Sequence, residues 1–368
     1  MSDAAKNHLS DQGHAFIAYG SNAFRLTVKQ WLIVLLIVAP LFALAPTLWR
    51  HAEKLEVSGD FRMNYDLASD YWLYSNCAAR AAEHYDALVV GDSVIWGQYV
   101  TPNQTLTHYL NELAGRERFG NVGLDGAHPM ALAGLLQHYG KAISNKNVVL
   151  LCNALWMSSP KHDLQISDEF NFNHPRLVPQ FTPKIPCYRA DASTRLGIVV
   201  ERNVEFNNWA AHLQQSYFDQ KDIPSWTLDH PYECPFSRLK IDPPPDDPTK
   251  LHHEPEPWTK KGVKPTDFPF VDLNTSLQWS AFKRAVEVLR ARGNHVVVVI
   301  NPLNEHMLTG KSREVYAKLK GSIESDLRAM QVDCIVPELL PSEEYADASH
   351  PLSPGYKRLA SELFEKLK

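Results

Sequence analysis

A short apolar run that ends at a serine is the feature that most constrains how this chain folds. Residues 87–90 read Ala-Leu-Val-Val, and Gly91, Asp92 and Ser93 follow directly. An apolar run with two β-branched residues predicts a buried strand of a parallel sheet. Ligands of open α/β sheets bind just beyond the carboxyl ends of such strands, which makes Ser93 a candidate nucleophile. The alternative is an ordinary turn in which Ser93 caps a helix.

Further apolar runs alternate with amphipathic segments along the chain. Such alternation favours a parallel sheet with helices on both faces, because crossover connections are right-handed. The sequence therefore predicts an α/β fold, a three-layer α/β/α sandwich with a five-stranded parallel sheet. The further strands are predicted at 119–122, 147–151, 295–300 and 332–336, and the helices at 105–114, 129–143, 276–292, 312–330 and 353–367.

The alternation stops between about residues 158 and 275. This stretch is rich in proline, as in the run at 242–248, and proline disrupts both helices and sheets. We interpret it as an insertion with one helix near 194–215, folded over the strand ends as a lid or binding region. A disulfide between Cys187 and Cys234 is expected to hold it if the domain is exported. Its aromatic residues are candidates for stacking on sugar rings, with core packing as the alternative; they are Trp209, Trp226, Tyr232 and Trp258.

Residues 30–50 are almost wholly apolar and predict a transmembrane anchor. Trp31 and Trp49 are 18 residues apart, roughly 27 Å of helix at about 1.5 Å per residue, which matches a bilayer core with an aromatic residue at each interface. The alternative is a cleaved signal peptide. The predicted organisation is a polar tail at 1–29, the anchor at 30–50, a juxtamembrane segment at 51–84 and a catalytic domain at 85–368.

A second group of reactive side chains lies near the end of the chain, at Asp347-Ala348-Ser349-His350. If this loop meets Ser93, His350 takes the serine proton, and Asp347 orients the imidazole and stabilises its cation. The alternative is a surface loop with a solvated histidine.

Donors for an oxyanion are predicted at the ends of three strands. They are the N–H of Ser93, the N–H of Gly126 and the side-chain amide of Asn153, with Gly123 as a rival to Gly126. Because parallel strands end at one edge of the sheet, these groups are expected to meet the triad there.

These motifs, in this order, resemble the blocks of the SGNH (GDSL-type) hydrolase superfamily. The first block resembles Gly91-Asp92-Ser93, the second residues 121–126, the third Cys152-Asn153 and the last Asp347-x-x-His350. The resemblance covers roughly residues 86–157 and 276–368. The third block departs from the family's Gly-x-Asn-Asp pattern, because cysteine precedes Asn153 and alanine follows it. The resemblance implies a serine esterase or O-acyltransferase that forms an acyl-enzyme and needs no cofactor or metal.

The predicted anchor makes the chain similar to membrane-bound SGNH proteins of the DltD-like and AlgJ-like kinds, whose Pro-x-Asn pattern resembles Pro302-Leu303-Asn304. This resemblance implies an acyl-ester donor and a hydroxyl acceptor on an exported polysaccharide or cell-envelope polymer. It also implies a membrane-bound O-acyltransferase as partner and a single-pass protein of the cytoplasmic membrane with its catalytic domain outside. The charges that flank the span do not decide this orientation. The alternative function is a catalytically silent binding or scaffold subunit of a membrane-bound O-acyltransferase complex.

Other features carry weaker predictions. The net charge of −5 argues against a nucleic-acid partner. The run at 252–254, His-His-Glu, is a weak candidate for metal ligation, because a metal site needs more ligands at defined spacing. His128 and His306 are expected near strand ends, at the polar rim of the site or in contact with substrate.

Overall fold

The computed structural model describes residues 26–367, and most of the polar tail predicted at 1–29 lies outside the described residues. The chain divides into two compact units, residues 1–45 and 46–368. Helix α1 (Val28–Ala52) begins in the first unit and ends in the second. It has 25 residues and contains an 18-residue window with a mean hydropathy of 2.4, so it is long and apolar enough to span a membrane.

The second unit is built on a sheet of five parallel strands. Their order is β2-β1-β3-β4-β5, and each neighbouring pair is parallel. The predicted sheet is confirmed, and all five strands end at the same edge. The strands are β1 (Ala87–Val90), β2 (Phe119–Asn121), β3 (Asn147–Cys152), β4 (His295–Ile300) and β5 (Asp333–Ile335).

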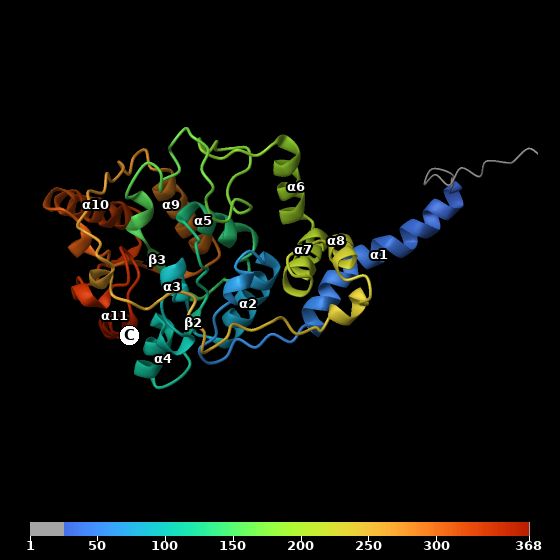
Figure 1. Ribbon diagram of the computed structural model, residues 1–368, viewed down its shortest axis with the longest axis horizontal. Coiled ribbons are helices and arrows are strands. Elements are labelled where there is room, and N and C mark those ends of the chain that lie inside the picture. The colour runs from blue at the N-terminus through green and yellow to red at the C-terminus, as the bar shows by residue number, and fades with distance from the viewer. Residues whose placement is uncertain (1–25, 368) are drawn as a thin grey trace, which may run out of the picture. The chain divides into compact units, whose positions relative to one another are not determined.

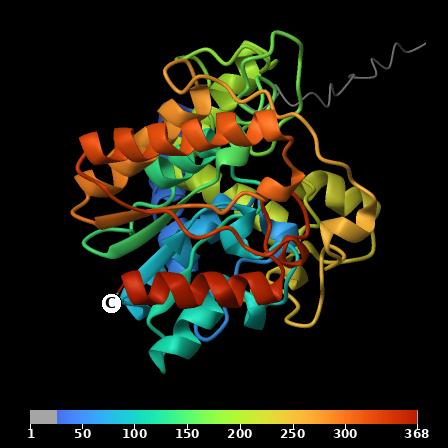
Figure 2. The same ribbon diagram turned by 90° about the vertical axis from the view of Figure 1, so that its left-hand side faces the viewer.

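Helices cover both faces of the sheet, as predicted. Leu88 and Val90 of β1 pack into the layer of α2 (Tyr71–His84), α5 (Pro129–His138), α9 (Leu277–Ala291) and α10 (Gly310–Ala329). Val89, one residue away, packs on the other side against α4 (Leu106–Ala114) and α11 (Ser353–Lys366). Successive strand residues point to opposite faces, so a wholly apolar strand serves both layers. Figure 2 shows the sheet between α10 on one side and α11 on the other.

The insertion contains three helices, α6 (Ala192–Asn203), α7 (Glu205–Tyr217) and α8 (Ile223–Asp229) (Figure 1). The single helix predicted near 194–215 is wrong, because Val204 has extended backbone angles (φ −109°, ψ 107°) and separates α6 from α7. The aromatic residues of the insertion differ in their packing. Trp226 packs inside the insertion against Leu213 and Phe218, whereas Trp258 packs outside it against Leu340 and Tyr345. Trp226 is 0% exposed and Trp258 is 7% exposed, whereas Tyr232 is 99% exposed.

The predicted disulfide in the insertion is also wrong. Cys187 and Cys234 are both free thiols. Cys187 is buried in a cluster with Leu164 and Val178, whereas Cys234 is exposed. A disulfide requires a specific separation of the two α-carbons, and spacing along the chain does not determine that separation.

Candidate active site

Ser93 lies at the carboxyl end of β1, as the first residue of the short helix α3 (Ser93–Trp96). The cap of this helix is Asp92, whose Oδ1 accepts a hydrogen bond from the Val94 N–H at 3.0 Å. The alternative in which Ser93 is the cap is therefore wrong. The hydroxyl of Ser93 instead lies 2.8 Å from Nε2 of His350.

His350 is held by a carboxylate on its other nitrogen. Its Nδ1 lies 2.9 Å from each oxygen of Asp347. A ring that donates from Nδ1 keeps a lone pair on Nε2, which can accept the Ser93 proton. The Asp347 carboxylate also accepts the backbone N–H groups of Ser349 and His350, each at 2.9 Å. The three residues predicted as a triad thus form one hydrogen-bonded chain.

The opposite charges of Asp347 and protonated His350 stabilise each other. Burial by itself lowers the pKa of His350, but the Asp347 carboxylate raises it, and the net shift is upward. Burial by itself raises the pKa of Asp347, but the charge and hydrogen bonds of His350 lower it more, and the net shift is downward. Asp347 therefore stays ionised at neutral pH, and His350 is a stronger base than a free imidazole.

The loop after β4 fixes the loop that carries His350. Asn301 donates from Nδ2 to the carbonyl of Ser349 at 2.9 Å. Asn304, the last residue of the Pro-Leu-Asn motif, donates from Nδ2 to the carbonyl of Asp347 at 3.0 Å and from its N–H to that of Ala348 at 2.9 Å. These two side chains are therefore positioning residues for the Asp–His loop.

Asn153 follows β3 and reaches the same edge. Its Nδ2 donates to Oδ2 of Asp92 at 2.8 Å, and Nε1 of Trp156 donates to the same oxygen at 2.9 Å. An amide nitrogen carries two protons, so one proton of Asn153 remains for an oxyanion. The N–H of Ser93 is among the first donors of a helix, which have no intrahelical acceptor.

The two glycines of the second block have different surroundings. A Cβ at Gly123 would lie 2.6 Å from the backbone nitrogen of Trp96, so this glycine permits close packing on α3. Gly126 has a positive φ of 71°, and a Cβ there would lie 2.6 Å from Nδ2 of Asn173. Gly123 is explained by packing, and Gly126 stays the predicted oxyanion donor.

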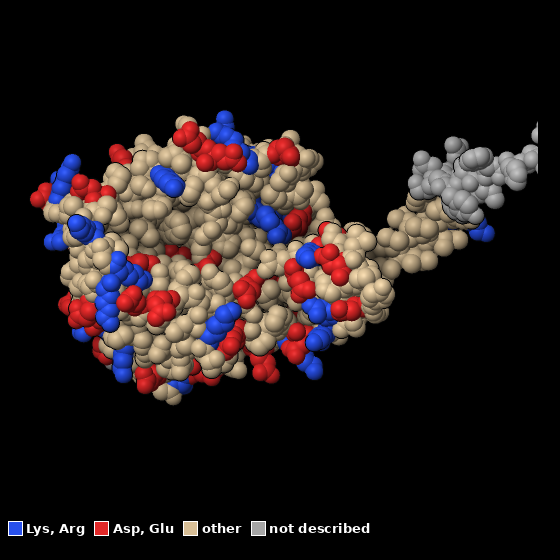
Figure 3. Space-filling view, in the orientation of Figure 1, with Lys and Arg blue, Asp and Glu red and all other residues tan. Residues whose placement is uncertain are grey.

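The sequence analysis did not place three side chains near the triad, namely Tyr99, Asp125 and His253. The ring of Tyr99 lies 5.4 Å from that of His350 and 5.4 Å from that of His253. Asp125 also interacts electrostatically with His350, and burial raises its pKa to about 6. The position of Asp125 beside Gly126 is a signal that could have found it, whereas His253 lies in the insertion. The face of the molecule in Figure 3 is hollowed near its centre, where α3 lies in Figure 1, and acidic residues border the hollow.

The remaining candidate histidines lie elsewhere. The predicted rim position of His128 is wrong, because it is 1% exposed and bonded to Gln278 and to the backbone of Asn173. Burial lowers its pKa to about 4. His306 bonds to the carbonyl of Leu340 at 3.1 Å. Within residues 26–367, no three His, Cys, Asp or Glu side chains are grouped so that they could hold a metal ion.

No protein-family model matches this chain, and neither does any curated protein sequence.

Proposed function

We propose that this protein is a serine acyl-ester enzyme of the SGNH type, either an O-acyltransferase or an esterase, anchored in a membrane by α1. The observation that supports this best is the chain of contacts from Asp347 through His350 to Ser93, with distances of 2.9 and 2.8 Å. Acyl transfer needs a nucleophile, a base, an orienting acid and oxyanion donors in one place.

In the first half-reaction, Ser93 Oγ attacks the acyl carbon of the donor ester, and its proton passes to Nε2 of His350. Asp347 stabilises the imidazolium that forms. The negative oxygen of the intermediate is held by the N–H groups of Ser93 and Gly126 and by the amide of Asn153. The leaving alkoxide takes the proton from His350, and an acyl-Ser93 ester remains.

In the second half-reaction, water or an acceptor hydroxyl attacks the acyl-Ser93 ester. Its proton passes to His350, which returns it to Ser93 Oγ as the ester bond breaks. By the resemblance described above, the acceptor belongs to an exported polysaccharide or cell-envelope polymer. The catalytic domain then lies outside the cytoplasmic membrane and takes its acyl group from a membrane-bound O-acyltransferase.

The test is covalent labelling of the full-length protein with a fluorophosphonate, followed by mass spectrometry. We expect the label on Ser93, and we expect an acetyl adduct on the same residue after incubation with p-nitrophenyl acetate. Ser93→Ala should lose the label and at least about 10⁴-fold in ester turnover without a change in thermal stability. Ser361→Ala, on the exposed side of α11, is the matched control.

Wild-type protein that is folded but takes up no label would contradict the proposal. That result would favour the silent scaffold subunit instead.

A further inference from the structure

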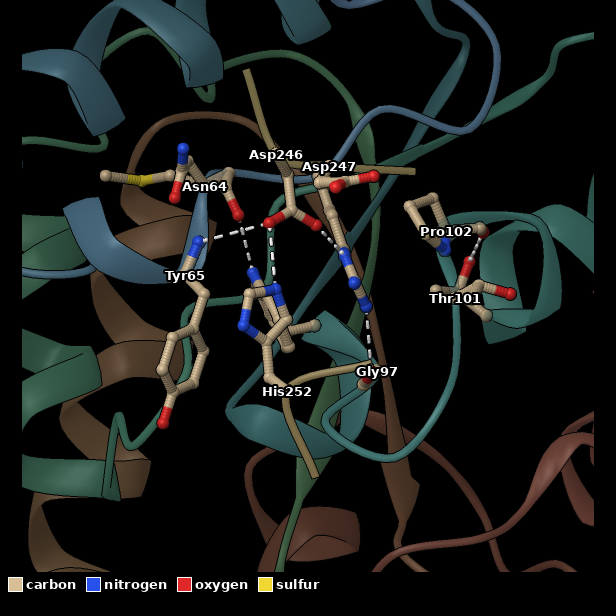
Figure 4. A network of polar contacts seen from close by, with 12 residues as sticks. Asn64, Tyr65, Gly97, Thr101, Pro102, Asp246, Asp247 and His252 are labelled. Atoms are coloured by element: carbon tan, nitrogen blue, oxygen red, sulfur yellow. Dashed lines mark hydrogen bonds and ion pairs between the residues drawn. The ribbon is translucent and has the colours of Figure 1, made fainter. Parts of the chain in front are cut away.

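A segment of the insertion, residues 246–261, is fastened on both sides of the catalytic edge; we call it the strap. At its start, Asp246 forms a buried ion pair with Arg62 at 2.7 Å, and Arg62 donates to the carbonyl of Gly97 at 2.9 Å, just after α3 (Figure 4). Near its end, the N–H of Trp258 donates to the carbonyl of Tyr345 at 2.9 Å. The strap therefore connects the α3 side of the site with the loop that carries the catalytic histidine.

The first histidine of the strap belongs to its anchor. The ring of His252 stacks on that of Tyr65 with centroids 4.4 Å apart, and its Nε2 lies 3.1 Å from Asp246 (Figure 4). The face and the Nε2 atom of the ring are thus both engaged with the protein.

The second histidine reaches the rim of the triad. Nε2 of His253 lies 3.0 Å from Nε2 of Gln98, and the ring of Tyr99 lies 5.4 Å from that of His253 and 5.4 Å from that of His350. Because the Gln98 amide donates, the neutral ring of His253 carries its proton on Nδ1. His253 therefore brings a further donor to the rim.

Asp125 supplies a hydrogen-bond acceptor, whereas His253 supplies a donor. Among the described residues, its Oδ1 is buried without a hydrogen-bond partner, which is a costly state for an acceptor. Its electrostatic neighbours are His350 and Asp92 at the triad, and His252, Arg62 and Tyr65 at the anchor of the strap. The carboxylate thus lies within electrostatic range of both the catalytic edge and the strap.

The charges around this space disfavour an ionised ligand. Nζ of Lys261 lies 5.0 Å over the ring of Tyr99, so a cationic ligand would meet a positive charge at the rim. An anionic ligand would meet the carboxylates of Asp125 and Asp92. A neutral hydroxyl can donate to Asp125 without either repulsion.

We propose that Asp125, His253 and Tyr99 form the subsite of a neutral polyhydroxy acceptor, in which one hydroxyl attacks the acyl group on Ser93 and a neighbouring hydroxyl donates to Asp125. This inference rests on the proposed acyl-transfer function. The attacking oxygen forms a bond to the acyl carbon while its proton goes to His350. The bond from the acyl carbon to Ser93 Oγ then breaks, and His350 returns the proton to that oxygen.

The test is a competition between two alcohols for one acetyl-enzyme. Full-length protein in detergent is supplied with p-nitrophenyl acetate and a mixture of glycerol and methanol, and both acetate esters are quantified by mass spectrometry. Both alcohols offer a reactive hydroxyl, but only glycerol has a second hydroxyl for Asp125. A general loss of activity cancels in the ratio of the two products.

We expect wild-type protein to prefer glycerol, and Asp125→Ala to reduce this preference by about tenfold or more, as for a hydrogen bond to a charged group. His253→Ala should reduce it as well; its side chain is partly exposed, so this variant keeps the test valid if Asp125→Ala does not fold. Asp86→Asn, on the residue just before β1 and away from the catalytic edge, should keep the wild-type ratio.

An unchanged ratio in both subsite variants would overturn the subsite, and a preference for ethanolamine over glycerol would overturn the neutral class of acceptor. Failure of the proposed function looks different. In that case, p-nitrophenol release that depends on Ser93 would be absent before any acceptor is added. This result would overturn the proposed function and, with it, the acceptor subsite.

Discussion

His350 and His212 are both held by carboxylates, yet their second ring nitrogens have different partners. At the sheet edge that carries Ser93, His350 has the Asp347 carboxylate on Nδ1 and the hydroxyl of Ser93 on Nε2. His212, in α7, has carboxylates on both nitrogens. Its Nδ1 lies 2.8 Å from Asp70, and its Nε2 lies 2.8 Å from Glu53, just after α1.

The second partner decides what each histidine can do. Two carboxylates favour a cation that donates from both nitrogens, so His212 has no lone pair with which to act as a base. Its side chain is 0% exposed, and it joins α2 and α7 to the end of α1. The hydroxyl beside Nε2 of His350 brings no second negative charge, so the neutral form of the ring can accept a proton at that nitrogen. A histidine held by carboxylates thus joins helices at His212, whereas at His350 it is a candidate base.

The largest expected effect comes from removing the carboxylate of the Asp347–His350 pair. Asp347→Asn should lower kcat/KM for p-nitrophenyl acetate by about 10³- to 10⁴-fold, because an amide favours the tautomer that cannot accept the Ser93 proton. The thermal midpoint should change little, since Asp347 is partly exposed. Steady-state kinetics and thermal unfolding measure both. A variant that retains a tenth of the wild-type rate would separate Asp347 from catalysis.

The same kind of change in the other cluster should affect stability instead. His212→Gln should destabilise the second unit by about 3–5 kcal/mol, because Glu53 and Asp70 lose the cation between them. Chemical denaturation in detergent measures this, and the exposed His295→Gln is the control. The folded fraction should still take up the serine-directed label. Loss of label from folded protein would mean that the two clusters are coupled.

The pH dependence of this stabilisation has a definite sign. Burial by itself lowers the pKa of His212, but Asp70 and then Glu53 raise it to about 9. A histidine whose pKa is raised on folding stabilises fully below its unfolded value of about 6.5, and the contribution is lost as the pH rises through 9. The difference in unfolding free energy between wild-type protein and His212→Gln should therefore shrink between pH 7 and pH 10.

Most of the sheet and the triad could be predicted from local sequence, for a physical reason. The apolar runs that become β1, β3 and β4 are buried on both faces, so their composition alone identifies them. Parallel strands end at one edge, which brings Ser93, Asn153 and His350 together without any knowledge of side-chain contacts.

The insertion was not predictable in the same way, because long-range contacts determine its position. The ion pair that fastens the strap joins Arg62 to Asp246, 184 residues apart. No local pattern identifies His253 as a neighbour of His350. The free thiols of Cys187 and Cys234 show the same limit, since their environments depend on tertiary packing.

A smaller effect is expected from removing one of the predicted oxyanion donors. The cluster around His212 has no such donors. Asn153→Ala should reduce ester turnover by roughly 10- to 100-fold, somewhat below the usual cost of losing one such donor, because the backbone donors remain. The Ser93 label should persist with slower kinetics. If turnover is unchanged, Asn153 only supports Asp92 and is not part of the oxyanion hole.

The smallest expected effect concerns the pH at which His350 becomes active. Burial by itself lowers the pKa of His350, while Asp347, then Asp92 and Asp125, raise it. Deacylation requires neutral His350. The acid limb of the pH profile of kcat should therefore have a midpoint above the ordinary histidine pKa of about 6.5. The charged groups that act on His350 and on its neighbour Asp125 also include Arg62, His252 and His253.

Asp125→Asn removes one of these negative charges, so the acid limb should move to lower pH. Asp125 itself has a raised pKa of about 6, and its titration is coupled to that of His350. The variant should therefore also show a simpler limb with a single ionisation. Rates of p-nitrophenyl acetate hydrolysis from pH 5 to 9 measure both, and Asp86→Asn should match the wild type. A limb that stays in place would show that the Asp125 carboxylate is too well screened to influence His350, and that the basicity of His350 comes from Asp347 and Asp92.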